Sequence, residues 1–191
     1  VQLVANKAYA ERVTSIDELL SLGLEPLRES LVQKIGENIS IRRVEVFNRP
    51  HVFSYVHTNN KIGVLVALQG GSEALGKDIA MHIAAASPMV VSPDEAPADV
   101  ISKEREIYTV QASESDKPPE IAAKIVEGRI RKYLEEISLT EQAFVKDSDL
   151  TVGSLLKKED SKVVKFRRYE VGEGIDKVED DFAAEVAKQL T

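Results

Sequence analysis

The chain has no cysteine among its 191 residues. This absence excludes disulfide bonds, thiolate metal sites and a cysteine nucleophile, and it fits a reducing compartment. No apolar run approaches the roughly 20 residues that a membrane-spanning helix needs. The first residues, VQLVANK, lack the basic stretch and the apolar core of a secretion signal. They also lack an initiator methionine, so we expect the chain to begin inside a longer gene product.

Signatures of enzyme active sites and nucleotide pockets are missing as well. The three histidines, His51, His57 and His82, form no His-x-x-x-His pair that would indicate a metal site. The glycine turns at 70–71 and 172–174 are not phosphate loops, because the first lacks the spacing and the second lacks a following Lys-Ser/Thr. No Gly-x-Ser-x-Gly elbow supports a Ser–His–acid triad. We therefore expect no enzyme active site, no metal ion and no cofactor.

Basic residues are outnumbered in this chain. Lys and Arg total 25 against 32 Asp and Glu, which gives a formal net charge of -7. This balance argues against nucleic acid as the main ligand, since phosphate binding needs clustered Lys and Arg. One basic cluster, at 165–168, lies in a strand-like run. We interpret it as a solvated strand face rather than a nucleic-acid site.

Apolar spacing predicts three short helices in the first 36 residues. The first covers 3–13, the second ends at Gly23, and the third begins near Pro26 and reaches about Gly36. The spacing then changes from about 3.6 residues to about 2, because 39–47 is rich in β-branched residues and partly alternates apolar with polar. Such a junction exposes backbone at the edge of a sheet, where a partner can dock.

Three strand candidates follow one another at 39–47, 52–57 and 62–68, separated by turn-forming residues. An antiparallel meander is the simplest arrangement of such strands. A helix over 73–86, capped by Ser72, comes next.

From 98 to 137 the pattern is helical, with one polar, proline-containing interruption at 113–119. Two helical arms joined by a tight turn form an antiparallel, coiled-coil-like hairpin that we expect to project from the domain. The alternative is two ordinary helices that pack on the main core.

The remaining elements are mixed. We expect a short extended piece at 142–145, a helix over 151–159, a strand over 163–171 and a final helix over 178–190. The predicted fold class is α+β, with short antiparallel sheets flanked by helices. In isolation His57 is a typical exposed turn residue, and His82 is a typical half-buried histidine with satisfied hydrogen bonds.

Several segments together resemble the bacterial translation elongation factor Ts. They occur in that family's order and spacing and cover the chain from about residue 28 to its end. In chain order they are KIGENI at 34–39 with IRR at 41–43, KIGVLV at 61–66, AMHIAA at 80–85 with Pro88, IVEGR at 125–129, VGEGI at 171–175 and DFAAEV at 181–186.

The resemblance implies guanine-nucleotide exchange on elongation factor Tu in the cytoplasm. Such a factor binds Tu loaded with GDP, disturbs the Mg²⁺ and phosphate region and lets GDP leave, so it needs no nucleotide pocket, cofactor, membrane or direct nucleic-acid contact. It also implies two core subdomains, at 1–60 and 61–175, with the helical hairpin inserted at about 98–138. A C-terminal helix at 176–191 would reach the nucleotide-binding domain of Tu.

The resemblance also assigns partner-binding residues by position. Ile35, Gly36 and Glu37 match the helix end that meets the nucleotide-binding domain of Tu. His57 matches a histidine that reaches toward the Mg²⁺ side. The remaining residues are assigned in pairs: Phe144 and Val145 to the region that faces the third domain of Tu, and Phe182 and Val186 to the C-terminal helix.

Two features of the family are missing from this sequence. These are the N-terminal ubiquitin-associated-like helical module and the Thr-Asp-Phe-Val motif whose Asp and Phe wedge between helices of Tu. We therefore expect the chain to bind Tu but to exchange GDP much more slowly than the complete factor. A second hypothesis is a self-associating scaffold, with the helical hairpin as the dimerisation element and no exchange activity; an enzyme ranks third.

Overall fold

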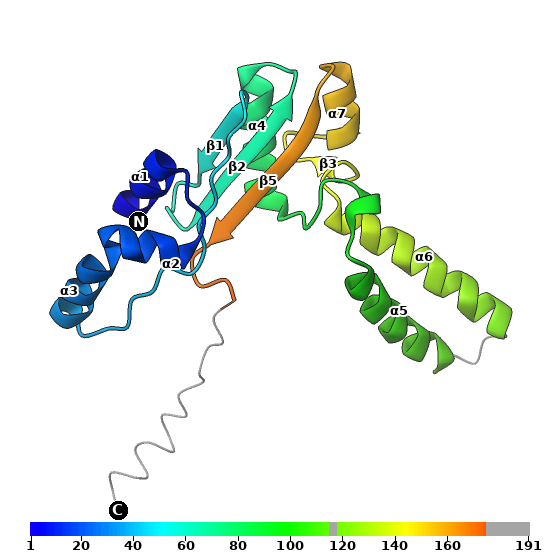
Figure 1. Cartoon of the computed structure of the whole chain (residues 1–191). Coiled ribbons are helices and arrows are strands. Elements are labelled where there is room, and N and C mark those ends of the chain that lie inside the picture. The colour runs from blue at the N-terminus through cyan, green and yellow to red at the C-terminus, as the bar shows by residue number, and fades with distance from the viewer. Residues whose placement is uncertain (115–117, 175–191) are drawn as a thin grey trace, which may run out of the picture.

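A computed structural model describes residues 1–114 and 118–174 of the chain (Figure 1). It combines short helices with a three-stranded and a two-stranded antiparallel sheet, and it therefore confirms the α+β prediction. No helix in the described ranges is both long enough and apolar enough to cross a membrane.

Three short helices and a π-helical turn build the N-terminal part. They are α1 (Gln2–Glu11), α2 (Ile16–Leu19), η1 (Leu20–Leu24) and α3 (Glu25–Ile35). The side chain of Ser15 accepts a hydrogen bond from the Glu18 N–H and so begins α2. Gly23, at φ 97°, makes the kink that separates α2 from α3. The helices predicted from apolar spacing are thus confirmed.

The main sheet contains β1 (Val52–Val56), β2 (Ile62–Gln69) and β5 (Lys162–Glu170), with β2 in the centre and antiparallel to both neighbours. Helix α4 (Glu73–Ala86), capped by Ser72 as predicted, packs on one face of this sheet. The main core fills the space between them. Its fully buried members include Val66 from β2 and Ile79 and Ile83 from α4.

The expected strand at 39–47 is not a strand, and the three-strand meander was wrong. The second neighbour of β2 is β5, from much later in the chain. Within the described part of the chain, the backbone of 40–47 makes no hydrogen bond to other backbone groups. Alternation in sequence indicates a pleated chain, but a strand also needs a neighbour for its N–H and C=O groups. We call 39–47 the extended segment.

The side chains of the extended segment do alternate. Val44 and Val46 pack against a small cluster of α1 and α2 that contains Ala8 and Leu19. Between them, Glu45 points the other way and pairs with side chains of β5. The extended segment therefore lies between the N-terminal helices and the face of the sheet opposite α4.

The hairpin arms are α5 (Ala98–Ser113) and α6 (Pro119–Ile137), which follow the 3₁₀ turn η2 (Pro93–Glu95). They have a hydrophobic cluster of their own, separate from the main core, which includes Ala112, Val126 and Ile130. Figure 1 shows the two arms projecting side by side away from the sheet. The projecting hairpin is therefore confirmed over the alternative of two helices on the main core.

The hairpin is fastened at its root, where the chain enters and leaves it. Val90 and Ser138 form a β-bridge, and the Leu139 N–H donates to the Val90 carbonyl at 3.0 Å. After the root come the strands β3 (Ala143–Phe144) and β4 (Asp147–Thr151) and the helix α7 (Val152–Lys158).

The division into subdomains stays a prediction. Its expected boundary at 60–61 falls in the turn between β1 and β2, and all five residues of β1 pair with β2. The expected C-terminal helix at 176–191, with Phe182 and Val186, lies outside the described residues.

Candidate partner-binding surface

Helix α3 presents an apolar row to solvent along one side. Leu27 and Leu31 are each 39% exposed and Ile35 is 55% exposed, and their spacing of four places them on one side of the helix. No side chain of α3 is fully buried. An apolar groove of about 910 Å³ lies between α1, α3 and the extended segment, and Leu27 and Leu31 line it.

Gly36 ends α3 in the left-handed conformation, with φ 79° and its N–H donating to the Val32 carbonyl at 2.8 Å. No heavy atom lies within 4 Å of the position that a Cβ would take, so the backbone conformation alone favours glycine there. Arg28 then holds the chain beyond the turn, because its Nη1 donates to the Ile39 carbonyl at 3.1 Å. Ile35, Gly36 and the exposed Glu37 thus form a fixed, solvent-facing tip.

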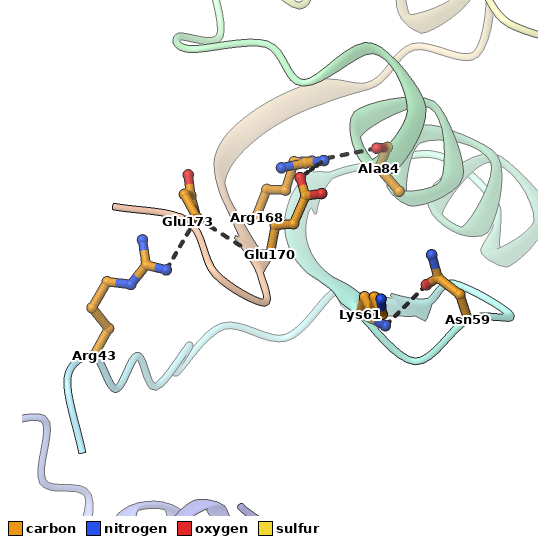
Figure 2. A network of polar contacts seen from close by, with 7 residues as sticks. All are labelled: Arg43, Asn59, Lys61, Ala84, Arg168, Glu170 and Glu173. Atoms are coloured by element: carbon orange, nitrogen blue, oxygen red, sulfur yellow. Dashed lines mark hydrogen bonds and ion pairs between the residues drawn. The ribbon is translucent and has the colours of Figure 1, made fainter. Parts of the chain in front are cut away.

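A polar network fixes the middle of the extended segment (Figure 2). Arg43 pairs with Glu173 at 3.0 Å, and the same carboxylate accepts from the Glu170 N–H at 3.4 Å. Glu170 accepts from Arg168 at 2.6 Å, and Arg168 Nε donates to the Ala84 carbonyl at 3.3 Å. The network therefore connects the extended segment, the end of β5 and the C-terminal turn of α4.

Glu45 makes a second connection between the extended segment and β5. Its carboxylate pairs with Lys165 and, at 3.5 Å, with Arg167. Burial raises the pKa of Glu45, but the hydrogen bond from Lys165 and the charges of Lys165 and Arg167 outweigh it and hold this pKa below 4.5. Two members of the basic cluster are thus solvated strand residues, as interpreted from sequence. Arg168 is not, since its side chain is only 14% exposed.

His57 follows β1 in the turn that leads to β2. Its N–H donates to the Ile62 carbonyl at 2.9 Å, and its Nδ1 lies 3.1 Å from the Tyr55 hydroxyl. The Lys61 carbonyl in the same turn accepts from the Val171 N–H at 2.8 Å. The turn of His57 therefore lies at the end of the sheet where β5 finishes, and Figure 2 shows Asn59 and Lys61 there.

Phe144 and Val145 differ in their exposure. Phe144 is 6% exposed and belongs to the main core, whereas Val145 is 52% exposed. Only Val145 of this pair is available to a partner. Its turn, between β3 and β4, is held by His82 of α4, a residue that we did not assign to the site from sequence.

His82 is fully buried, with no exposed surface. Its Nε2 lies 3.0 Å from Gln142 Oε1, and its Nδ1 accepts from the Val145 N–H at 3.2 Å. The sequence interpretation of a histidine with satisfied hydrogen bonds is confirmed, although the ring is more deeply buried than expected. Nothing in the sequence links position 82 to position 145, because that contact forms across the fold.

The predicted site residues do not converge on one point. Figure 1 shows the end of α3 on one side of the molecule and β3 on the other, near the root of the hairpin. Phe182 and Val186 lie outside the described residues. No group of three or more metal-ligating side chains is found in the ranges that the structure describes. Separate exposed patches of this kind suit a macromolecular partner rather than a small ligand.

Comparison with known proteins identifies the family. The family model described as Elongation factor TS matches residues 1–173. The elongation factor Ts of Hahella chejuensis is 57% identical over 187 residues, which cover 98% of this chain and 65% of that protein. The proteins of the same name from Francisella tularensis subsp. novicida and Teredinibacter turnerae are each 50% identical, over 99% and 100% of this chain and 67% and 66% of their own length. The chain thus spans about two thirds of these curated relatives, and it belongs to the elongation factor Ts family.

Proposed function

We propose that this chain is the core of a guanine-nucleotide exchange factor for elongation factor Tu. It binds Tu loaded with GDP in the cytoplasm and promotes GDP release by disturbing the Mg²⁺ and phosphate region, without covalent chemistry of its own. Membership of the elongation factor Ts family is the observation that carries this proposal. The fixed tip at Ile35 and Gly36 supports it, since an exposed apolar side chain on a rigid turn is suited to docking.

Exchange of this kind works by thermodynamic coupling between two binding events. A protein that weakens the hold of Tu on GDP must itself be held more weakly by Tu when GDP is present, by the same factor. The factor therefore needs contacts that differ between the GDP-bound and the nucleotide-free forms of Tu. We assign these contacts to the tip of α3 and to His57, whose ring is oriented by the Tyr55 hydroxyl at 3.1 Å.

The chain spans about two thirds of the length of its relatives. We propose that these residues are enough to bind Tu, but that they accelerate GDP release from Tu less than a full-length factor does. A stopped-flow assay with fluorescent GDP tests both statements. We expect the chain to speed GDP release from Tu, but less than the full-length Hahella chejuensis protein does. A release rate that the chain leaves unchanged would refute exchange, and a rate equal to that of the full-length relative would refute the impairment.

Two substitutions locate the contacts in the same assay. Ile35→Ala removes an exposed apolar side chain, and we expect about a tenfold loss in affinity for Tu with the fold intact, as for a central interface residue. Leu22→Ala is the matched control, because Leu22 is also a partly exposed aliphatic side chain with four carbon atoms, at 37%, but lies outside the tip. Equal effects of the two substitutions would count against docking at the tip.

A self-associating scaffold is the second candidate function. The observation in its favour is that the hairpin exposes Ile107, Val110 and Ile121, at 47%, 59% and 48%, outside its own hydrophobic cluster. Gel filtration separates the two candidates. An exchange factor elutes with Tu and loses Tu in excess GDP, whereas a scaffold elutes as a dimer that neither Tu nor GDP changes.

A further inference from the structure

The turn between β3 and β4 has a sequence that does not favour it. Phe144 pairs with Asp147, which leaves only Val145 and Lys146 in the loop. Two-residue hairpin loops prefer turn types with positive φ, which Asn and Gly adopt easily. Neither Val145 nor Lys146 is among the residues with positive φ. This turn therefore depends on contacts from outside the hairpin.

Helix α4 supplies those contacts from two positions one turn apart. Asp78 pairs with Lys146 at 2.6 Å, and His82 accepts the Val145 N–H at 3.2 Å through Nδ1. The Lys146 pair is partly exposed, with side-chain exposures of 50% and 33%, so it contributes little to stability. The buried imidazole is the stronger of the two supports, because a buried hydrogen bond is costly to leave unmade.

The tautomer of His82 follows from its neighbours. The Gln142 amide donates to the Glu136 carbonyl at 2.7 Å through Nε2, so its Oε1 must be the atom that faces His82. An amide oxygen only accepts, and His82 Nε2 therefore carries the proton and donates. Nδ1 is then left with a lone pair directed at the Val145 N–H. Burial lowers the pKa of His82 below 6.5, partly opposed by the bond to Gln142, and so favours this neutral ring.

We propose that His82 is a positioning residue, which holds the Val145 amide through Nδ1 and thereby presents the exposed Val145 side chain to elongation factor Tu. The hold on Val145 stands on the geometry alone, and the role toward Tu rests on the proposed function. The imidazole fixes the turn from its buried side while the isopropyl group of Val145 remains 52% exposed.

Two amide substitutions separate the two nitrogens of the ring. In His82→Asn the side-chain oxygen is bonded to Cγ, as Nδ1 is in histidine, and it can still accept the hydrogen bond from the Val145 N–H. In His82→Gln the amide reaches the level of Nε2 and can still donate to Gln142, but the acceptor for Val145 is lost. Both variants replace a buried imidazole by a polar amide, so their general cost to the fold is matched, and only the hold on Val145 differs.

The first measurement is amide hydrogen exchange of Val145, followed by NMR on the whole chain. Within the described residues, His82 Nδ1 is the acceptor recorded for this N–H. We expect exchange to be about tenfold faster or more in His82→Gln and within about threefold of wild type in His82→Asn, as for one lost hydrogen bond. Unchanged protection of Val145 in His82→Gln would overturn the proposal.

The second measurement is the affinity for Tu loaded with GDP. We expect His82→Gln to weaken binding about three- to tenfold and His82→Asn to leave it nearly unchanged. Val145→Ala is the companion variant, because it should weaken binding while its amide stays protected. Equal losses of binding in both His82 variants, with Val145 still protected in His82→Asn, would overturn the role toward Tu.

Two further outcomes keep the proposals distinguishable. If the wild-type chain does not bind Tu, the proposed function fails, and the exchange of the Val145 amide still decides whether His82 holds the turn. If a variant does not fold, the ¹⁵N shifts of the wild-type imidazole decide instead. A protonated Nε2 with an unprotonated Nδ1 supports the proposal, and a protonated Nδ1 overturns it.

Discussion

The sheet with α4 and the N-terminal part with α1 to α3 are stabilised in different ways. In the first, β2 pairs on both edges and α4 buries Ile79 and Ile83 completely. In the second, α3 has no buried side chain, and the extended segment has no backbone partner in the described part of the chain. Its packing on the small cluster of α1 and α2, together with ion pairs such as Arg43 with Glu173, holds that segment in place. The first region is stabilised by a buried core, whereas the side chains of α3 in the second region remain accessible to a partner.

The largest contrast should appear when one side chain is shortened in each region. Ile83→Ala leaves a cavity in the main core, and we expect the free energy of unfolding to fall by about 2–5 kcal/mol. Leu31→Ala on α3 removes a side chain that is 39% exposed, and we expect a loss below about 1 kcal/mol. Urea denaturation measures both values, and similar losses would show that the two regions are packed alike.

Glycine-to-alanine substitutions should change the stability in opposite directions at a left-handed helix end and in the middle of a helix. Gly36 is left-handed, so Gly36→Ala strains the end of α3 and should cost about 1 kcal/mol. Gly128 lies within α6 with no neighbour near a new Cβ, so Gly128→Ala should stabilise the chain by about 0.5–1 kcal/mol. Thermal unfolding measures the sign of each effect. A stabilising Gly36→Ala would contradict the left-handed conformation of the tip.

Acid should weaken the two regions in separate pH ranges. The pKa of His82 is lowered in the folded chain, so the unfolded chain binds more protons just below pH 6.5, and stability should decrease as the pH falls from there. The pKa of Glu45 is also lowered, and its contribution is kept above pH 4.5 and lost as the pH falls through the folded value. Urea unfolding across pH should show both losses. His82→Asn should abolish the first loss, and Glu45→Gln should reduce the second, to which Glu25, Glu73 and Glu173 also contribute because their pKa values are lowered as well.

The smallest effect concerns salt. Glu45→Gln removes the pairs with Lys165 and Arg167, whose side chains are about half exposed, and should cost below about 1 kcal/mol at low salt. The cost should shrink as salt is added, because exposed charges are screened. Ile83→Ala is the control, since a cavity in the core responds little to salt. A cost that does not change with salt would mean that Glu45 acts by packing.

Sequence predicted the helices well because their signals are local. Ser72 and Gly36 mark helix ends through the conformation of a few neighbouring residues. The extended segment was mistaken for a strand because alternation reports only which side chains face inward. Whether a segment has a neighbouring strand depends on pairing with residues distant in sequence, and the second neighbour of β2 is β5 rather than the extended segment. Pairing of that range is not encoded in the spacing of nearby residues.

In the candidate site, too, the features set by neighbouring residues could be predicted from the sequence, whereas those set by distant contacts could not. The tip at Ile35 and Gly36 was predicted as a helix end and is one. Phe144 and Val145 are adjacent in sequence, yet only the fold decides that the first is buried and the second exposed. The hydrogen bond from Val145 to His82 joins two elements that are distant in sequence. The sequence predicted that His82 has hydrogen-bond partners, but it could not predict which residues these partners are.

The bridge between Val90 and Ser138 has a consequence for how the chain folds. Pairing of β2 with β5 must close a long loop that contains both arms of the hairpin, and loop closure slows folding. The arms contact each other locally and have their own hydrophobic cluster, so they can form early. Once the bridge joins their two ends, the length of the arms no longer adds to the loop that the sheet has to close. Evolution can therefore lengthen or shorten this hairpin with little effect on the folding rate of the sheet.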